Sequence, residues 1–341
     1  MTMASPKKIA EEYPPPNEQA DSEELAQRLI AKIAENYPSG IMRRDAHPKM
    51  HGLVKAEFCV EPNLPPELAV GLFKEAKSWP AWIRFSNQNE KAQSDTEGDI
   101  RGMAIKLMGV PGEKILDEDK HATTHDFLLI SAPVLVTADL KEFLQLVKAL
   151  MGNFFTMLWF FATHWRATYN LTSAMKKAAN PLQLRYWSTT PYLFGAGRAV
   201  KYCTMPVLEQ VDKIPPDAGD NLLREAMVRQ LNQGGASFDF CVQFQTDADN
   251  MPIEDAGALW KESESPFRKV ATIKIPAQQF DNATRNEYGD NLSFIPWHAL
   301  PEHRPLGGVN RGRRIVYRAV SIFRHEKNKA VRQEPDGYVI D

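Results

Sequence analysis

The stretch GLVKAEFCV, residues 52–60, decides the fold. Val54, Ala56, Phe58 and Val60 are separated by more polar residues, and this period of two is typical of a strand with one buried face. The sequence holds further short segments that are rich in aliphatic or aromatic residues and bounded by turns. These segments are 81–86, 101–108, 127–130, 237–245 and 270–276. Together they predict a mainly antiparallel sheet closed into a β-barrel.

Helical periodicity surrounds these strands. Asp21 and Ser22 offer caps for an amphipathic helix that ends before Pro38. Three later stretches also have apolar residues at helical spacing. They cover residues 139–165, 221–232 and 310–325. The expected fold class is therefore α+β, with an antiparallel β-barrel core and helices around it.

The first 20 residues differ in composition from the rest of the chain. Residues 1–20 are polar and proline-rich, and such a segment cannot bury enough apolar surface to order itself alone. It is expected to form a flexible N-terminal arm, and it has no apolar region typical of a secretory signal. No later change in composition marks a boundary, so residues 21–341 are expected to form a single domain.

Composition excludes several classes of function. The 41 basic and 43 acidic residues are mixed along the chain and give a formal net charge of −2, so we expect no nucleic-acid partner. Cys59, Cys203 and Cys241 have no CxxC spacing, which argues against a disulfide framework or a zinc site and favours a reducing, cytoplasmic setting.

The most apolar run of the sequence covers residues 144–162. It is interrupted by Gln145, Lys148 and Asn153, whereas a spanning helix needs about 20 nearly unbroken apolar residues. We expect a buried or lipid-facing helix here and no transmembrane segment.

The segment RGRRIVYRAVSIFR, residues 311–324, carries the first chemical signal. Arg313, Tyr317 and Arg324 are spaced by four and seven residues, which places them on one stripe of a helix. A neighbouring guanidinium favours the phenolate form of a tyrosine, and a phenolate binds ferric iron well. A solvated helix could carry the same spacing without any such role.

The second signal is RRDAHPKMHG, residues 43–52, in which Arg44 precedes His47 by three residues. A histidine can move a peroxide proton from one oxygen to the other as the O–O bond breaks. Two alternatives remain. His47 and His51 could bind a metal ion as a pair, although Pro48 disfavours a helix and no third ligand is evident. His47 could also have a purely structural role.

The third signal is the expected strand WIRFSNQ, residues 82–88. Alternation places Arg84 and Ser86 on one face and Ile83 and Phe85 on the other. An arginine pointing into a barrel needs an anion, and either a haem propionate or a protein carboxylate would serve. The serine hydroxyl could orient a nearby imidazole.

Together and in this order, these segments resemble the haem catalase superfamily, in particular its small catalase-related branch of catalase-like peroxidases. The resemblance runs from about residue 40 to 325, rests on five segments, and implies that the expected antiparallel β-barrel core is of catalase type. They are HPKMHG (47–52), WIRFSNQNEKAQSDTEGDIRGMAIKL (82–107), YWSTTPYLFGAGRAVKY (186–202), WHALPEHRPLGGVNR (297–311) and RGRRIVYRAVSIFR (311–324).

The resemblance implies one haem b (iron protoporphyrin IX) as cofactor. It implies that Tyr317 is the metal ligand and that Arg313 hydrogen-bonds its phenolate. It implies that His47 is the distal acid–base residue and that Ser86 contacts it. The arginines expected at the haem propionates are Arg44, Arg84 and Arg324.

The match departs from large catalases at HATTHDFLLIS, residues 121–131. A distal asparagine is expected before this strand, and Thr124, or Thr123 if the alignment slips by one residue, stands in its place. A hydroxyl on a short β-branched side chain cannot reproduce the reach or the two donors of an amide. We therefore expect a third catalytic position at Thr124 and little efficient dismutation of hydrogen peroxide.

The expected function is that of a haem-dependent peroxidase acting on hydrogen peroxide or organic hydroperoxides, with a small-molecule electron donor as second partner. One alternative is a haem enzyme of the allene oxide synthase type that rearranges fatty acid hydroperoxides. Another is a haem-binding protein without turnover. The sequence leaves the assembly open, with a homodimer as one option.

Overall fold

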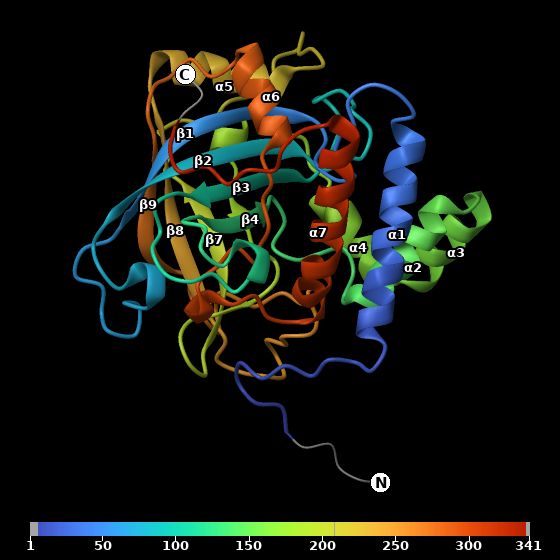
Figure 1. Cartoon of the computed structure of the whole chain (residues 1–341), viewed down its shortest axis with the longest axis horizontal. Coiled ribbons are helices and arrows are strands. Elements are labelled where there is room, and N and C mark those ends of the chain that lie inside the picture. The colour runs from blue at the N-terminus through green and yellow to red at the C-terminus, as the bar shows by residue number, and fades with distance from the viewer. Residues whose placement is uncertain (1–5, 208, 339–341) are drawn as a thin grey trace.

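The computed structural model describes residues 6–207 and 209–338. Its strands form one antiparallel sheet in the order β5-β4-β3-β2-β1-β9-β8-β7-β6, and pairing of β5 with β7 closes eight of them into a barrel (Figure 1). The strands are β1 Met50–Val60, β2 Ser78–Asn87, β3 Arg101–Leu107, β4 His125–Ile130, β5 Tyr186–Trp187, β6 Tyr192–Leu193, β7 Ala199–Pro206, β8 Ala236–Phe244 and β9 Arg268–Ile275. The predicted antiparallel barrel is confirmed.

The barrel interior is filled with side chains. Phe58 of β1 stacks on Phe127 of β4 at 6.0 Å between ring centroids and meets Phe240 of β8 edge-on at 5.0 Å. These rings belong to the largest buried cluster of the described residues, which draws on β1–β4 and β7–β9. The barrel core is therefore a packed support, and any bound group must lie outside the barrel wall.

The orientation of β2 corrects one expectation. Ile83 and Phe85 belong to the interior cluster, so Arg84 and Ser86, on the alternate face, lie outside the barrel wall. The prediction that Arg84 points into the barrel was wrong. Both side chains are nevertheless buried, because other elements cover this part of the wall.

The helices lie around the barrel. They are α1 Glu18–Asn36, α2 Leu140–Met151, α3 Phe154–Thr163, α4 Trp165–Ala174, α5 Leu222–Gln233, α6 Ala283–Asn291 and α7 Gly308–Asn328, with 3-10 turns at Gly71–Phe73, Asp117–Asp119, Pro181–Gln183 and Pro301–His303. Figure 1 shows α7 beside the barrel wall, α1 and α2 next to α7, and α3 farthest out. Leu25 and Leu29 of α1, Leu144 of α2 and Val316 of α7 share one buried cluster.

Two helical expectations need correction. The predicted helix over 139–165 is three helices, because the chain leaves helical geometry at Gly152 and Asn153 and again at His164. The Asn153 side chain accepts a hydrogen bond from the Thr156 amide at 3.1 Å and so begins α3. Helix α6 was not predicted. No helix in the described part of the chain is both long enough and apolar enough to cross a bilayer.

The predicted arm, residues 1–20, falls partly outside the described residues, since 1–5 are not among them. Its later residues contact the N-terminal end of α7. Arg311 of α7 binds carboxylates of Glu12 and Glu18, both at 2.5 Å at closest approach, and of Glu254 at 2.8 Å. Burial acts to lower the pKa of Arg311, but its hydrogen bonds to Glu18 and Glu254 outweigh burial and raise it. One domain over residues 21–341 stays a prediction.

Two buried histidines lie against the aromatic core. The His303 ring meets Phe73 at 5.3 Å and Phe194 at 5.5 Å between centroids, and the His125 ring lies 4.7 Å from that of Phe127. Burial lowers the pKa of His303 to about 4 and holds the pKa of His125 well below its usual value. Both rings are thus neutral in the folded protein near neutral pH.

This burial predicts acid sensitivity. Unfolded histidine takes a proton near pH 6.5, whereas folded His303 does so only near pH 4. The stability from its neutral form is complete above about pH 6.5 and is lost as the pH falls toward 4. We expect the free energy of unfolding to drop by about 2 kcal/mol for this residue between pH 7 and pH 5. Denaturant titrations at both pH values measure the drop.

Two variants isolate this contribution. His303→Gln should reduce the loss of stability between the two pH values. His121→Gln, at an exposed histidine, should leave the loss unchanged. An unfolding free energy that stays constant from pH 7 to pH 5 in the wild type would contradict the expectation.

Candidate functional site

His47 is held in an unusual backbone conformation just before β1. Its φ is +64°, in the left-handed region that non-glycine residues rarely adopt. The His47 amide donates to the Gln88 carbonyl at 3.2 Å, and the His47 carbonyl accepts from Arg84 Nη2 at 3.0 Å. The Nδ1 atom lies 3.1 Å from the Ser86 hydroxyl. The predicted Ser86 contact is present, and it leaves Nε2 without a hydrogen bond among the described residues.

Gly102 makes room for the His47 ring. In the pairing of β2 with β3, Gly102 lies opposite Ser86, and a Cβ at Gly102 would lie 2.6 Å from ring atoms of His47. Only a residue without a side chain allows the imidazole this close to the barrel wall. Ile130 of β4 pairs with Gly102 on its other side, so an apolar residue borders the position of the histidine.

The protonation state of His47 follows from its surroundings. Burial lowers its pKa to about 3, and the charges of Arg84, Arg44 and Arg313 act in the same direction. The imidazole is therefore neutral at every pH near 7 and can accept a proton. The effect of Arg313 also indicates that this residue of α7 lies close to His47.

Three arginines from distant segments converge on the end of α6. Arg44 donates to the Leu292 carbonyl, and Arg324 of α7 donates to the Asp290 carbonyl. Arg84 Nη2 lies 3.7 Å from a carboxylate oxygen of Asp290. The structure therefore brings together the three residues that the sequence assigned to one anionic group.

These cations outnumber the anion that faces them. Burial lowers the pKa of Arg44 to about 10 and that of Arg324 to about 9, and it lowers the pKa of Arg84 strongly. Arg44 adds to the effect on both of the others, and the opposing charge is Asp290. Arg84 Nε is buried and has no partner among the described residues. The cluster is suited to a ligand with two negative charges.

A cavity of about 490 Å³ opens beside this cluster. Asp290, the carboxylate that faces the arginines, lines it. Its other lining residues are Arg43, Pro48, Lys49, Met50, Ala92, Asn221, Arg224 and Asn286.

Tyr317 and Arg313 lie one turn apart on α7. Arg313 Nη1 donates to Thr190 Oγ1 and Asn310 Oδ1, both at 3.1 Å. Tyr317 is half-buried, and its hydroxyl makes no hydrogen bond within the described part of the chain. The charge of Arg313 also contributes to the low pKa of His47. No bond between Arg313 and the Tyr317 hydroxyl is present.

Thr124 is not brought to this site. Strand β4 pairs with β3 so that Ile130 faces Gly102 and His125 faces Leu107. Thr124 therefore lies at the far end of β4, about 20 Å along the strand from Ile130 at roughly 3.3 Å per residue. The prediction of a catalytic position at Thr124 was wrong, because sequence spacing does not fix the register between strands.

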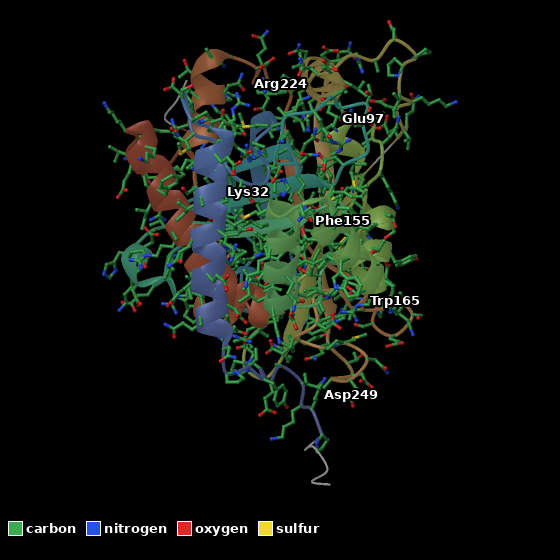
Figure 2. All side chains as sticks on the ribbon, turned by 90° about the vertical axis from the view of Figure 1, so that its right-hand side faces the viewer. Lys32, Glu97, Phe155, Trp165, Arg224 and Asp249 are labelled. Carbon is green, nitrogen blue, oxygen red and sulfur yellow. The ribbon has the colours of Figure 1, made fainter. Side chains whose placement is uncertain are left out.

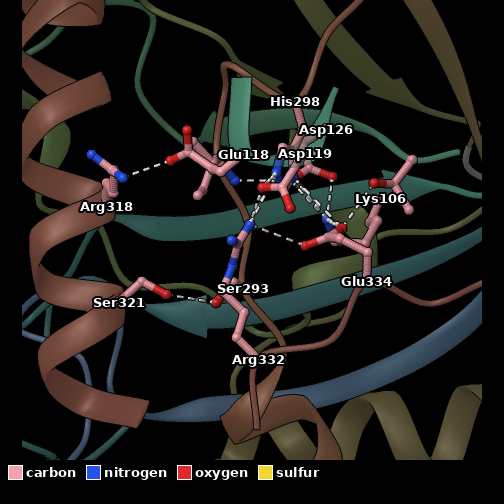
Figure 3. Close-up of polar contacts among 12 residues, drawn as sticks. Lys106, Glu118, Asp119, Asp126, Ser293, His298, Arg318, Ser321, Arg332 and Glu334 are labelled. Carbon is pink, nitrogen blue, oxygen red and sulfur yellow. Dashed lines mark hydrogen bonds and ion pairs between the residues drawn. The ribbon is translucent and has the colours of Figure 1, made fainter. Parts of the chain in front are cut away.

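Thr124 instead belongs to a buried polar network that holds the C-terminal segment. Figure 3 shows Lys106, Asp126, His298 and Glu334 of this network. Its hydroxyl donates to Glu334 at 2.8 Å, and Lys106 Nζ binds Glu334 at 2.6 Å and Asp126 at 2.7 Å. His298 Nε2 lies 2.6 Å from Asp119. The side chains of this network come from β3, β4, the loop before β4, the loop before α7 and the chain after α7.

The metal alternative for His47 and His51 is not supported. His51 Nε2 lies 2.6 Å from Asn87 Oδ1, so its ring is engaged in a different set of contacts. Within residues 6–207 and 209–338, no group of three or more His, Cys, Asp or Glu side chains could hold a metal ion. The three cysteines are likewise unpaired.

Sequence reasoning missed three residues of the site. Gly102 stands in the quoted segment 82–107, but only the strand register shows that it faces His47. Ile130 is likewise placed by register. Asp290 lies at the end of α6, a helix that no periodicity in the sequence predicted.

Comparison with known proteins supports the fold. The chain aligns with a crystal structure of a fungal catalase at a TM-score of 0.69, with 16% identity over 94% of this chain and 66% of that one. A bacterial catalase structure aligns at a TM-score of 0.66, with 15% identity over 87% of this chain and 60% of that one. No family model and no curated protein matches the sequence. The chain has a catalase-like fold and spans less than two thirds of both neighbours.

The close approach at Gly102 predicts the effect of adding a side chain. Gly102→Ala would place a methyl group 2.6 Å from the His47 ring, so the imidazole must move. We expect a loss of about 1–3 kcal/mol in the free energy of unfolding and a displaced His47 ring in a crystal structure. Gly219→Ala is the matched control, because nothing lies within 4 Å of a Cβ there. Equal stability of the two variants would refute this account.

Proposed function

We propose that this chain binds one haem b against the outer wall of its barrel and reduces hydrogen peroxide or an organic hydroperoxide at the expense of a small-molecule electron donor. The observation that carries the proposal is the excess of buried positive charge. Arg44, Arg84 and Arg324 surround one carboxylate, and the two propionates of a haem would balance them with charge-assisted hydrogen bonds.

The other residues of the site fit the same group. Tyr317 offers a half-buried phenol without a hydrogen bond among the described residues, and it shares a helix with Arg313 and Arg324. A cation near the phenol favours the phenolate form, which is a ligand for haem iron. The catalase-like fold supports the assignment. When bound, the haem would supply the iron centre and the oxidising equivalents for peroxide cleavage.

His47 would handle the proton in this reaction. Its imidazole is neutral because burial lowers its pKa to about 3, so it accepts a proton from the peroxide oxygen and returns it to the departing one. Ser86 holds Nδ1 at 3.1 Å and thereby orients the ring with Nε2 free to act. Haem propionates would offset the nearby arginines and make the bound-state imidazole more basic than in the free protein.

The electron donor would approach through the cavity beside the arginines. Arg43, Lys49 and Arg224 line this cavity together with Asp290, and Lys49 and Arg224 are paired with Asp95 and Asp281. These polar walls would suit a small polar donor.

One observation favours a second candidate function. Ile130, an apolar side chain, lies beside Gly102 next to the histidine. Thr124, at the other end of β4, supplies no polar group there. An apolar surface at this position suits a fatty acid hydroperoxide, the substrate class of allene oxide synthase-type enzymes. Loss of conjugated-diene absorbance without donor oxidation would select this function. Oxidation of a guaiacol-type donor would select the peroxidase.

Removal of the phenol tests the ligand. Tyr317→Phe takes away the phenolate and should shift the Soret and charge-transfer bands of the haem-loaded protein. Absorption spectroscopy after haem titration measures the shift. Tyr37→Phe is the control, since the one hydrogen bond that its hydroxyl makes to the described residues goes to the Glu90 carbonyl, at 3.5 Å. Wild-type bands in Tyr317→Phe would rule out this ligand.

Removal of the imidazole tests the proton transfer. His47→Ala should keep haem bound but slow peroxide consumption by roughly 10²- to 10⁴-fold, the usual effect of losing a general acid–base group. Stopped-flow measurement of peroxide loss gives the rate. His121→Ala should leave the rate unchanged, because His121 is exposed at the start of the segment before β4. A rate within a few-fold of the wild type for His47→Ala would be incompatible with the role.

A further inference from the structure

Helices α3 and α4 expose a row of large apolar side chains. Phe160 is the one buried residue of α3, and Figure 2 shows Phe155 and Trp165 on the side that α3 presents to solvent. We call this row the aromatic ridge. Its members and their exposed fractions are Phe154 65%, Phe155 75%, Leu158 54%, Trp159 72%, Trp165 75% and Tyr169 67%.

The size of the ridge exceeds what isolated surface residues require. Phe, Tyr and Trp side chains each bury about 150–250 Å² when fully covered, so five of them at these exposures leave roughly 500–900 Å² open to solvent. The largest apolar patch on a typical monomer is about 300–600 Å², and larger patches mark sites of association. The ridge therefore needs a partner.

The charges around the ridge identify the kind of partner. No Asp or Glu occurs anywhere in residues 143–208. Lys176 and Lys177 follow the end of α4, are exposed and form no ion pair within the described part of the chain. The other basic residues of α2–α4 near the ridge, Lys148 and Arg166, are paired with Glu24 and Asp255. The free charge next to the ridge is thus positive.

The shape of the ridge argues against a protein or peptide ligand in a groove. Figure 1 shows α3 projecting farthest from the barrel, and no residue of the ridge lines either of the two cavities at the arginine cluster. A convex apolar surface that carries Trp159, Trp165 and Tyr169 fits the boundary between lipid headgroups and acyl chains, where such rings concentrate.

We infer that the aromatic ridge is a docking surface for an anionic lipid bilayer, with α3 lying in the plane of the interface and Lys176 and Lys177 against the headgroups. Amphipathic helices with Phe, Leu and Trp on one side and lysine nearby bind in this way without crossing the membrane. The inference rests on the ridge and its flanking charges alone and does not depend on haem binding.

Vesicle flotation of the purified full-length protein tests the inference. We expect the wild type to float with vesicles of phosphatidylcholine mixed with phosphatidylglycerol and to bind more weakly to pure phosphatidylcholine. Phe155→Ser/Trp159→Ser should lower the partition coefficient more than tenfold on both, because two large rings no longer enter the apolar layer. Lys176→Gln/Lys177→Gln should weaken binding to the anionic vesicles by roughly fivefold per lysine and leave binding to phosphatidylcholine unchanged.

A matched pair of leucines controls for a general loss of surface hydrophobicity. Leu158 on the ridge and Leu259 elsewhere are each 54% exposed. Leu158→Ser should reduce flotation severalfold, and Leu259→Ser should not. Circular dichroism of each variant verifies that the fold is intact.

Three results would overturn the inference. The first is a wild type that fails to float with either vesicle type. The second is wild-type flotation of Phe155→Ser/Trp159→Ser. The third is a dimer in sedimentation equilibrium that Phe155→Ser/Trp159→Ser converts to a monomer while no variant binds vesicles, since the ridge would then be covered by a second copy of the chain.

Discussion

The candidate site depends on one constraint, the fixed position of α7 over the outer wall of the barrel. At its start, the amides of Gly307 and Gly308 donate to Glu12 and Glu254 at 2.8 and 2.7 Å, which satisfies donors that a helix N-terminus leaves free and places negative charge where the helix dipole favours it. Gly307 has a φ of +86°, and a Cβ there would lie 2.4 Å from the carbonyl oxygen of residue 253. At its end, Asn328 exchanges hydrogen bonds with the backbone of Met42 at 2.7 and 2.9 Å. Both ends of α7 are thus tied to loops, and the second tie is to the loop that continues into the site histidine.

The buried guanidinium groups lie beside α7 and carry unpaired positive charge. Transfer of a charge from water into protein is unfavourable unless it is paired, and Arg84 retains an unpartnered Nε in a buried position. Asp290, whose side chain is 36% exposed, offsets part of this charge. Binding of a dianionic group would offset the unfavourable free energy of the positive charge that Asp290 leaves unpaired. Affinity for the ligand and stability of this part of the fold are therefore coupled. Because Arg44 and Arg324 are anchored to carbonyls on either side of the end of α6, the cluster is organised before any ligand arrives.

Sequence patterns predicted the strands β1–β4, β8 and β9 and the long amphipathic helices. Strand β7 was missed because Lys201 and Thr204 interrupt the apolar run of Ala199–Pro206, although both side chains are buried in the structure. The period of two on β2 correctly grouped Arg84 with Ser86, but it could not tell which face looks into the barrel. The stripe on α7 was predictable because one long amphipathic helix carries it. Asp290 was not, since α6 has little amphipathic character and its role arises only from tertiary packing.

The same packing separates two tasks within the chain. The barrel interior is closed by aromatic rings, so the barrel acts as a scaffold and the chemistry is left to side chains on its outer wall. Helix α2 packs against α1 and α7 through Leu144 and Val147, and its other side meets α3 and α4 through a small cluster that includes Phe160 and Ala167. The α3 part of the aromatic ridge therefore rests on α2 through few buried contacts, whereas α4 is also held by Asn170, which donates to the Leu135 and Gly257 carbonyls. A chain built in this way can change what it docks on while it keeps the geometry around His47, because the two surfaces share α2 but no side chain.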